Sequence, residues 1–320
     1  MKNISLVILF FTALTLSGCQ TFNAQDAYNN ALKKTQSGDN KEAVEAYDQA
    51  IKLHGDGNNQ EVEKSATSTV SIEKSSEPVY NKEAELYYNR AIAKSNLGDD
   101  IGAIMDYDKV IEMNPKDVEA YNNRAIAKSN IGDYQSALAD YEVALSFFPN
   151  DSELYNNRGN SKSLAGDIDG ALLDYSKAIE LSPRDSRAYF NRAVTKVGLK
   201  DYAGAMVDYD MALELNPKDA DIYHNRGVLK YVMGEREGAI SDYNAAIKMD
   251  PKNADLYNNR GNAHSSLGNK NEALADYDMA IKLNSKDPQF YKNRAITKYA
   301  FDDKAGAQAD NQKARELEGK

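Results

Sequence analysis

Residues 121–134 read YNNRAIAKSNIGDY, and near copies of this stretch begin at Tyr87, Tyr155 and Tyr257. The copies start 34 residues apart or at a multiple of that spacing. Self-similarity at a fixed period of this length indicates a repeat architecture, in which each unit buries its apolar face against its neighbours. Chain length then measures the number of repeats and not the number of globular domains.

Within the period of 34, small and aromatic residues keep fixed positions. Position 8 is Ala or Gly, position 20 is Ala in all eight repeats, and position 27 is Ala except at Val110. Small side chains allow the two helices of a hairpin to approach closely, and tyrosines at positions 4 and 24 supply bulk around that contact. Gly recurs where the first helix must turn, and Pro recurs where the second helix must stop.

This pattern resembles the tetratricopeptide repeat, which implies an all-α fold, a right-handed superhelical α-solenoid of about eight helix-turn-helix repeats. The predicted repeats cover residues 24–57, 84–117, 118–151, 152–185, 186–219, 220–253, 254–287 and 288–320. Residues 58–83 interrupt the array, are rich in Ser, Thr, Glu and Lys, and are predicted to be a disordered linker. In the last repeat Gln308, Asn311 and Arg315 replace apolar or aromatic residues of the others, so we expect a solvating cap there.

The N-terminus has the pattern of a secretion signal. Lys2 precedes the apolar run 4–16, whose thirteen residues would span about 20 Å as a helix, short of the roughly 30 Å of a membrane core. The run leads into Leu16-Ser17-Gly18-Cys19, which resembles the bacterial lipobox, and Cys19 is the single cysteine of the chain. The resemblance implies a signal peptide over 1–18 and lipid on Cys19 at the start of a short N-terminus, 19–23. An ordinary signal peptide with a chance Cys is the alternative.

Composition excludes several functions. Lys and Arg total 39 against 49 Asp and Glu, a net charge of −10, whereas nucleic-acid binding needs clustered cations. One Cys and three His are too few for a structural zinc site, and we expect neither metal nor cofactor. The histidines share no repeat position, and the chain contains none of the common catalytic or phosphate-binding motifs. We therefore predict a protein that is not an enzyme.

Asn occupies position 6 of every repeat, and we call this series the Asn ladder. In the family it resembles, the first helix of each repeat lines a concave groove, where a side-chain amide matches the backbone of an extended peptide. Such a ladder resembles that of the glycosyltransferase-linked repeats. The alternative is that each Asn satisfies the start of its own helix or a neighbouring helix end. The predicted peptide-binding residues are Asn89, Asn123, Asn157, Asn191, Asn225, Asn259 and Asn293.

Two further sets of residues are candidates for a role. Arg at position 7 and Asp at position 23 occur together in seven repeats and are both missing from the first, so we predict structural ion pairs such as Arg124–Asp140 and Arg158–Asp174. Phe190, Val194 and Tyr231 are apolar where neighbouring repeats are polar, which predicts a contact site in the groove. Burial by the next helix is the alternative for these three.

Together these patterns predict a monomeric, lipid-anchored scaffold of a bacterial envelope, which its acyl chains would hold permanently on the membrane. We expect it at the outer membrane facing the periplasm, where it would bind a protein or peptide partner for envelope assembly, secretion or cell-wall remodelling. One alternative is a surface-exposed lipoprotein that contacts host proteins. Another, from a different class, is an enzyme.

Overall fold

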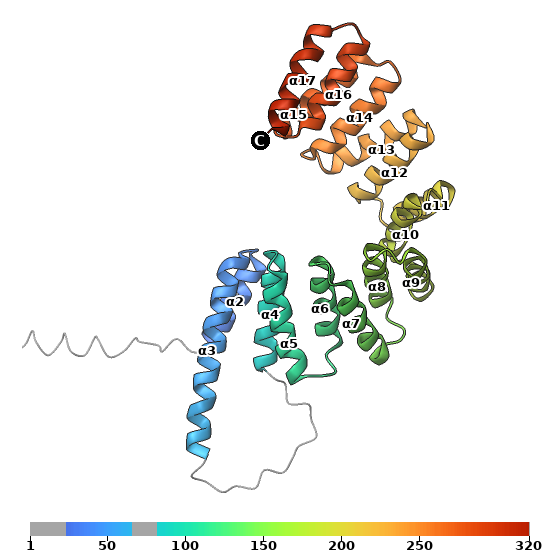
Figure 1. Ribbon diagram of the computed structural model, residues 1–320. Coiled ribbons are helices and arrows are strands. Elements are labelled where there is room, and N and C mark those ends of the chain that lie inside the picture. The colour runs from blue at the N-terminus through green and yellow to red at the C-terminus, as the bar shows by residue number, and fades with distance from the viewer. Residues whose placement is uncertain (1–23, 66–81, 320) are drawn as a thin grey trace, which may run out of the picture. The chain divides into compact units, whose positions relative to one another are not determined.

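The computed structural model describes residues 24–65 and 82–319, and within these ranges it is built of α-helices alone, in successive antiparallel pairs (Figure 1). The first helices of the pairs are α2 (Ala24–Gln36), α4 (Lys82–Asn96), α6 (Val118–Asn130), α8 (Ser152–Leu164), α10 (Ser186–Gly198), α12 (Ala220–Met233), α14 (Ala254–Ser266) and α16 (Pro288–Ala300). The second helices are α3 (Asn40–Ser65), α5 (Asp100–Met113), α7 (Tyr134–Phe147), α9 (Ile168–Leu181), α11 (Tyr202–Leu215), α13 (Arg236–Met249), α15 (Lys270–Leu283) and α17 (Lys304–Glu318).

The turn within each pair follows from one left-handed residue and one capping residue. Gly166 has φ of 86°, a conformation that costs glycine little, and Asp167 then accepts a hydrogen bond from the N–H of Gly170 to begin α9. The same turn recurs with Gly in five other repeats. In the remaining two, Lys200 and Asp302 adopt the left-handed conformation without being glycine.

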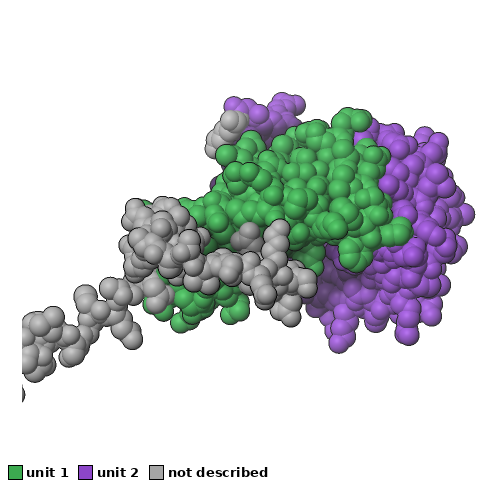
Figure 2. All heavy atoms as spheres, turned by 90° about the horizontal axis from the view of Figure 1, so that it is seen from below, with its two compact units in different colours: residues 1–149 green, residues 150–320 purple. Residues whose placement is uncertain are grey.

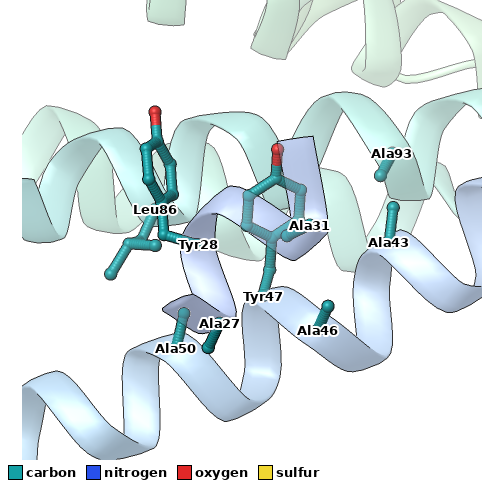
Figure 3. Packing of buried hydrophobic residues seen from close by; sticks show 9 residues of the cluster. All are labelled: Ala27, Tyr28, Ala31, Ala43, Ala46, Tyr47, Ala50, Leu86 and Ala93. Atoms are coloured by element: carbon teal, nitrogen blue, oxygen red, sulfur yellow. The ribbon is translucent and has the colours of Figure 1, made fainter. Parts of the chain in front are cut away.

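Alanines form the contact between the two helices of a pair. In the first pair Ala27, Ala31 and Ala43 are fully buried, and Tyr47 fills the space beside them (Figure 3). Leu86 of α4 packs on the same cluster, so the next repeat completes the core of the one before it. Each repeat therefore depends on its neighbour for burial, as expected for a solenoid.

The chain divides into two compact units, residues 1–149 and 150–320, which Figure 2 shows in different colours. The described helices of the first unit are α2 to α7, and those of the second are α8 to α17. Within the second unit the first helices contact one another in succession, α8 with α10, α10 with α12, α12 with α14 and α14 with α16. This row of first helices carries the candidate site described below.

The predicted linker begins later than the sequence suggested. Helix α3 continues to Ser65, so residues 58–65 are helical and not disordered. Gln, Glu and Lys in this segment are good helix formers, and they extend the helix past the end of the repeat. The rest of the linker up to residue 81, the leader and Cys19 lie outside the described residues. None of the described helices combines the length and apolar character that crossing a membrane requires.

The outer face of α17 is open and polar. Gln308, Asn311 and Arg315, the residues expected to form a cap, line a hollow of about 600 Å³ together with Tyr299 and Lys304. The structure thus places the three polar residues on one surface of the last helix.

Candidate functional site

The Asn ladder links the first helices of successive repeats by hydrogen bonds. Asn191 Nδ2 donates to Asn156 Oδ1 at 3.0 Å, and Asn293 Nδ2 donates to Asn258 Oδ1 at 2.8 Å. In each case the acceptor lies at position 5 of the preceding repeat. The ladder amide therefore joins one first helix to the next, a role that differs from the helix-end capping considered from the sequence.

Two further members of the ladder use a different acceptor at the same place. Asn123 Nδ2 donates to Tyr88 Oη at 2.9 Å, and Asn259 Nδ2 lies 2.9 Å from His224 Nε2. Because an amide nitrogen only donates, His224 Nε2 takes the acceptor role in this contact. Position 5 thus varies in residue type but supplies an acceptor in these repeats.

Asn225 departs from this pattern. Position 5 of the preceding repeat is Phe190, whose ring offers no acceptor and packs on Tyr209 with ring centroids 6.0 Å apart. Asn225 Nδ2 donates instead to the backbone oxygen of Asp221 in its own helix, at 2.8 Å. The side chain of Asn225 thus bonds within α12.

The other ladder residues are placed as follows. Asn89 is half-buried on α4, and Asn157 lines a pocket on α8. Asn29, in the first repeat, is exposed and accepts from Gln25 Nε2 at 2.9 Å. Like the rest of the ladder, these three residues stand at position 6 of their repeats, on the first helix.

The predicted Arg–Asp pairs join the two helices of a repeat. Arg124 donates to Asp140 through Nε at 2.9 Å and Nη2 at 2.6 Å, and Arg158 contacts Asp174 in the same two-bond geometry at 2.8 and 2.7 Å. Lys128 adds a third contact to Asp140 at 2.7 Å. A buried carboxylate is thereby surrounded by charged donors, which offsets its loss of hydration.

Sequence reasoning missed the lysine of this cluster. Lys occupies position 11 in seven repeats, and in six of them it pairs with the Asp of position 23. The fixed position was a visible signal, but only the fold brings positions 11 and 23 together. At Asp310 burial alone would raise the pKa, yet hydrogen bonds from Arg294 and Lys298 outweigh it and hold this pKa below its usual value.

Six of the seven arginines also reach the preceding repeat. Arg226 Nη1 contacts Asp210 Oδ1 at 2.7 Å, and its guanidinium lies 5.6 Å from the ring centroid of Tyr223. Arg294 repeats this arrangement on Asp278 and Tyr291. Because these arginines are saturated by structural partners, they are poor candidates for contacting a ligand.

Two pockets follow one another between α10 and α12. The larger, of about 290 Å³, adjoins α8 and is lined by polar side chains, including Asn156, Asn191 and Asp221, beside Phe190. The smaller, of about 120 Å³, is mainly apolar and is lined by Val194, Val197, Asn225, Val228 and Val232, among others. We call this pair of pockets the α10–α12 seam.

The structure separates the three apolar candidates. Phe190 and Val194 line the seam, one in each pocket. Tyr231 does not line either pocket; it packs with Ala239 and Tyr243, and the guanidinium of Arg236 lies 5.4 Å from its ring centroid. Tyr231 is therefore half-buried against α13 and lies outside the two pockets of the seam.

The described part of the chain contains no group of three or more His, Cys, Asp or Glu side chains arranged to hold a metal ion. The polar groups of the seam are amides, carboxylates, hydroxyls and the guanidinium of Arg187. These groups can form hydrogen bonds and charge contacts with a segment of another chain.

Paired helices that repeat every 34 residues and share one row of first helices define a helical-repeat protein. Tetratricopeptide repeat models match residues 84–117, 106–139, 152–185 and 254–287, and a further model described as TPR repeat matches 197–234 and 231–268. The chain belongs to the tetratricopeptide repeat family. Repeats of this family are typically scaffolds without catalytic activity.

Solved structures agree on the fold. A tetratricopeptide repeat protein from Parabacteroides merdae aligns with a TM-score of 0.60 and 19% identity over 86% of this chain and 98% of its own. PilF of Pseudomonas aeruginosa aligns with a TM-score of 0.58 and 18% identity, over 67% of this chain and 97% of its own. A comparison with curated proteins gave no match.

Proposed function

We propose that this protein is a scaffold that binds an extended segment of a partner protein along the α10–α12 seam. A tetratricopeptide solenoid is suited to binding proteins or peptides, because its first helices form a continuous row. The observation that carries the proposal is the seam itself, where two pockets lie in line on neighbouring first helices. A partner segment there would contact apolar, amide and carboxylate groups in turn.

The proposal extends to where the scaffold acts. The lipobox ending in Cys19 supports a lipid-anchored protein of the bacterial envelope, at the outer membrane facing the periplasm. There it recruits its partner for envelope assembly, secretion or cell-wall remodelling, as a monomer and without catalysing a reaction. A surface-exposed lipoprotein that contacts host proteins is the alternative.

Site-specific photo-crosslinking in the producing cell tests where the partner binds. A photoreactive phenylalanine replaces Val194 in the seam, or Leu173 and Val207 on second helices as exposed controls. The proposal expects a discrete cross-linked protein from position 194 and none from positions 173 and 207. Cross-links from the controls alone would place the partner on the other face and contradict it.

A further inference from the structure

The α10–α12 seam has a polar end and an apolar end at a fixed separation. Asp221 lies near the start of α12 at the polar pocket, and Val228 lies seven residues later at the apolar pocket. Seven residues of helix rise about 10.5 Å. An extended peptide covers that distance in about three residues, at roughly 3.3 Å per residue. A short segment laid along the seam therefore reaches both ends.

The apolar end is built by four valines from two helices. Val194 and Val197 come from α10, and Val228 and Val232 come from α12. Val194 remains 43% exposed and Val232 56% exposed, so neighbouring helices do not cover them. The repeats on either side have Asn and Ser at most of these positions, such as Asn160 and Ser163 before and Asn262, Ser265 and Ser266 after. The seam thus combines four valines where the two neighbouring repeats have mainly Asn and Ser.

The polar end carries an excess of negative charge. Asp221 is exposed, and both it and Asp255 of α14 act electrostatically on His224. The one cation in the lining, Arg187, is already paired with Asp185 at 2.8 Å. The charge that complements this end is therefore positive.

The middle of the seam holds the departure in the Asn ladder. Because Phe190 removes the usual acceptor, Asn225 bonds to its own helix, and it lines the apolar pocket between the two ends. One amide of the ladder is thus held on α12, away from the usual bond to the preceding first helix, in the lining of the apolar pocket.

We propose that the seam binds an extended partner segment that carries Lys or Arg at one position and an aliphatic residue about three positions away. The cation contacts Asp221, and the aliphatic side chain enters the pocket of the four valines. This inference rests on the proposed function, since it names the chemistry of the segment that the scaffold recognises.

The probe is a library of random dodecapeptides displayed on phage and selected on the purified chain beginning at Cys19. We expect selected peptides to share a basic residue about three positions from Leu, Ile or Val. In synthetic peptides, replacing the aliphatic residue by Ser should weaken binding about tenfold or more. Asp221→Lys should reverse the preference, so that selection on this variant enriches Asp or Glu at the same place.

Two variants change exposed valines of the seam, so they should not disturb the fold. Val194→Asp and Val232→Asp should each weaken binding of the selected peptides about tenfold, while helical content measured by circular dichroism is unchanged. Ile296→Asp is the matched control, because it lies at the same repeat position as Val194 but on α16, and it should bind as the parent does.

The outcomes separate the two proposals. Peptides that are weakened by Val194→Asp but lack the basic–aliphatic pattern would overturn this inference and leave groove binding standing. Peptides indifferent to every seam variant, or no selected peptides, would overturn both. Formation of a dimer that Val232→Asp abolishes would assign the seam to a second copy of the chain and would also overturn the inference.

Discussion

The buried carboxylate of Asp208 shows what a single residue contributes to this fold. It is 2% exposed and receives Arg192 Nη2 and Lys196 Nζ, each at 2.7 Å. The pairing of Arg and Asp could be predicted from their joint absence in the first repeat. The partner of the lysine at position 11 could not be predicted from the sequence, because it follows from how the two helices of a pair face each other. The Asn ladder was predicted as a series, but its acceptors lie 35 residues earlier and become visible only when repeats are stacked.

His224 makes one repeat contact sensitive to pH. Burial lowers its pKa, while Asp255 of α14 and Asp221 of α12 oppose the shift, and the ring of Tyr243 on α13 lies 6.2 Å away. Since the folded pKa lies below the unfolded value of about 6.5, the unfolded chain binds the proton more readily. The contribution of neutral His224 to the free energy of unfolding is therefore fully present above about pH 6.5. It decreases as the pH falls below that value, because protonated Nε2 cannot accept from Asn259.

The matched variant is His224→Asn, since Asn156 and Asn258 already accept at this position. Urea unfolding at pH 7.5 and 5.0 should show that the parent loses about 0.5–1.5 kcal/mol more than the variant on acidification. Equal losses in the two proteins would show that His224 does not titrate against this contact.

At the scale of the element, the sequence predicts the helix pairs well because caps and turns are local. Gly166 and Asp167 set the turn before α9 through their own backbone and side chain. The end of α3 is different, because the helix formers after the first repeat extend it to Ser65 while the repeat pattern stops earlier. The sequence singles out Phe190 and Val194, which line the seam, but the pockets themselves depend on which side chains of α10 and α12 meet.

Gly159 is expected to resist replacement even though other repeats carry Ala at the same position. A Cβ there would lie 2.8 Å from the ring of Tyr175, whose hydroxyl donates to Asn160 at 2.8 Å and fixes the ring. Gly159→Ala should therefore lower the free energy of unfolding by about 1 kcal/mol, the cost of overpacking exceeding the gain in helix propensity.

Gly198→Ala is the control for that measurement. A Cβ at Gly198 meets no atom within 4 Å, so this variant should be neutral or more stable by up to about 1 kcal/mol in urea unfolding. A stabilising Gly159→Ala would mean that the Tyr175 ring moves freely.

On the scale of the whole molecule, the 34-residue period sets the number of repeats but not which surface binds. Two of the five first helices in residues 150–320, α10 and α12, carry the seam. The proposed lipid anchor is a separate matter, because it rests on a motif of a few residues around Cys19 and not on the solenoid.

Cys19→Ala tests the anchor. Without the thiol there is no site for the lipid, so the protein should leave the membrane pellet after cell fractionation without detergent, or accumulate as uncleaved precursor. Cys19→Ser is a second variant that keeps the size of the side chain and should behave in the same way. Retention of either mature variant in the pellet would contradict the lipid anchor.

The arginines at position 7 have a consequence for how such a chain can change in length. Arg124 contacts Asp140, sixteen residues after it, and Asp108, sixteen residues before it. Arg90 contacts Asp48 across a separation of 42 residues, because the insertion after the first repeat lies between them. Duplication or loss of a whole 34-residue unit would thus keep every Arg–Asp pair within a repeat and place each arginine beside position 25 of the preceding repeat, where Asp108, Asp210 and Asp278 accept in this chain. Gene rearrangements in multiples of 102 base pairs should be tolerated, whereas deletions of part of a unit would leave buried charged side chains without their partners.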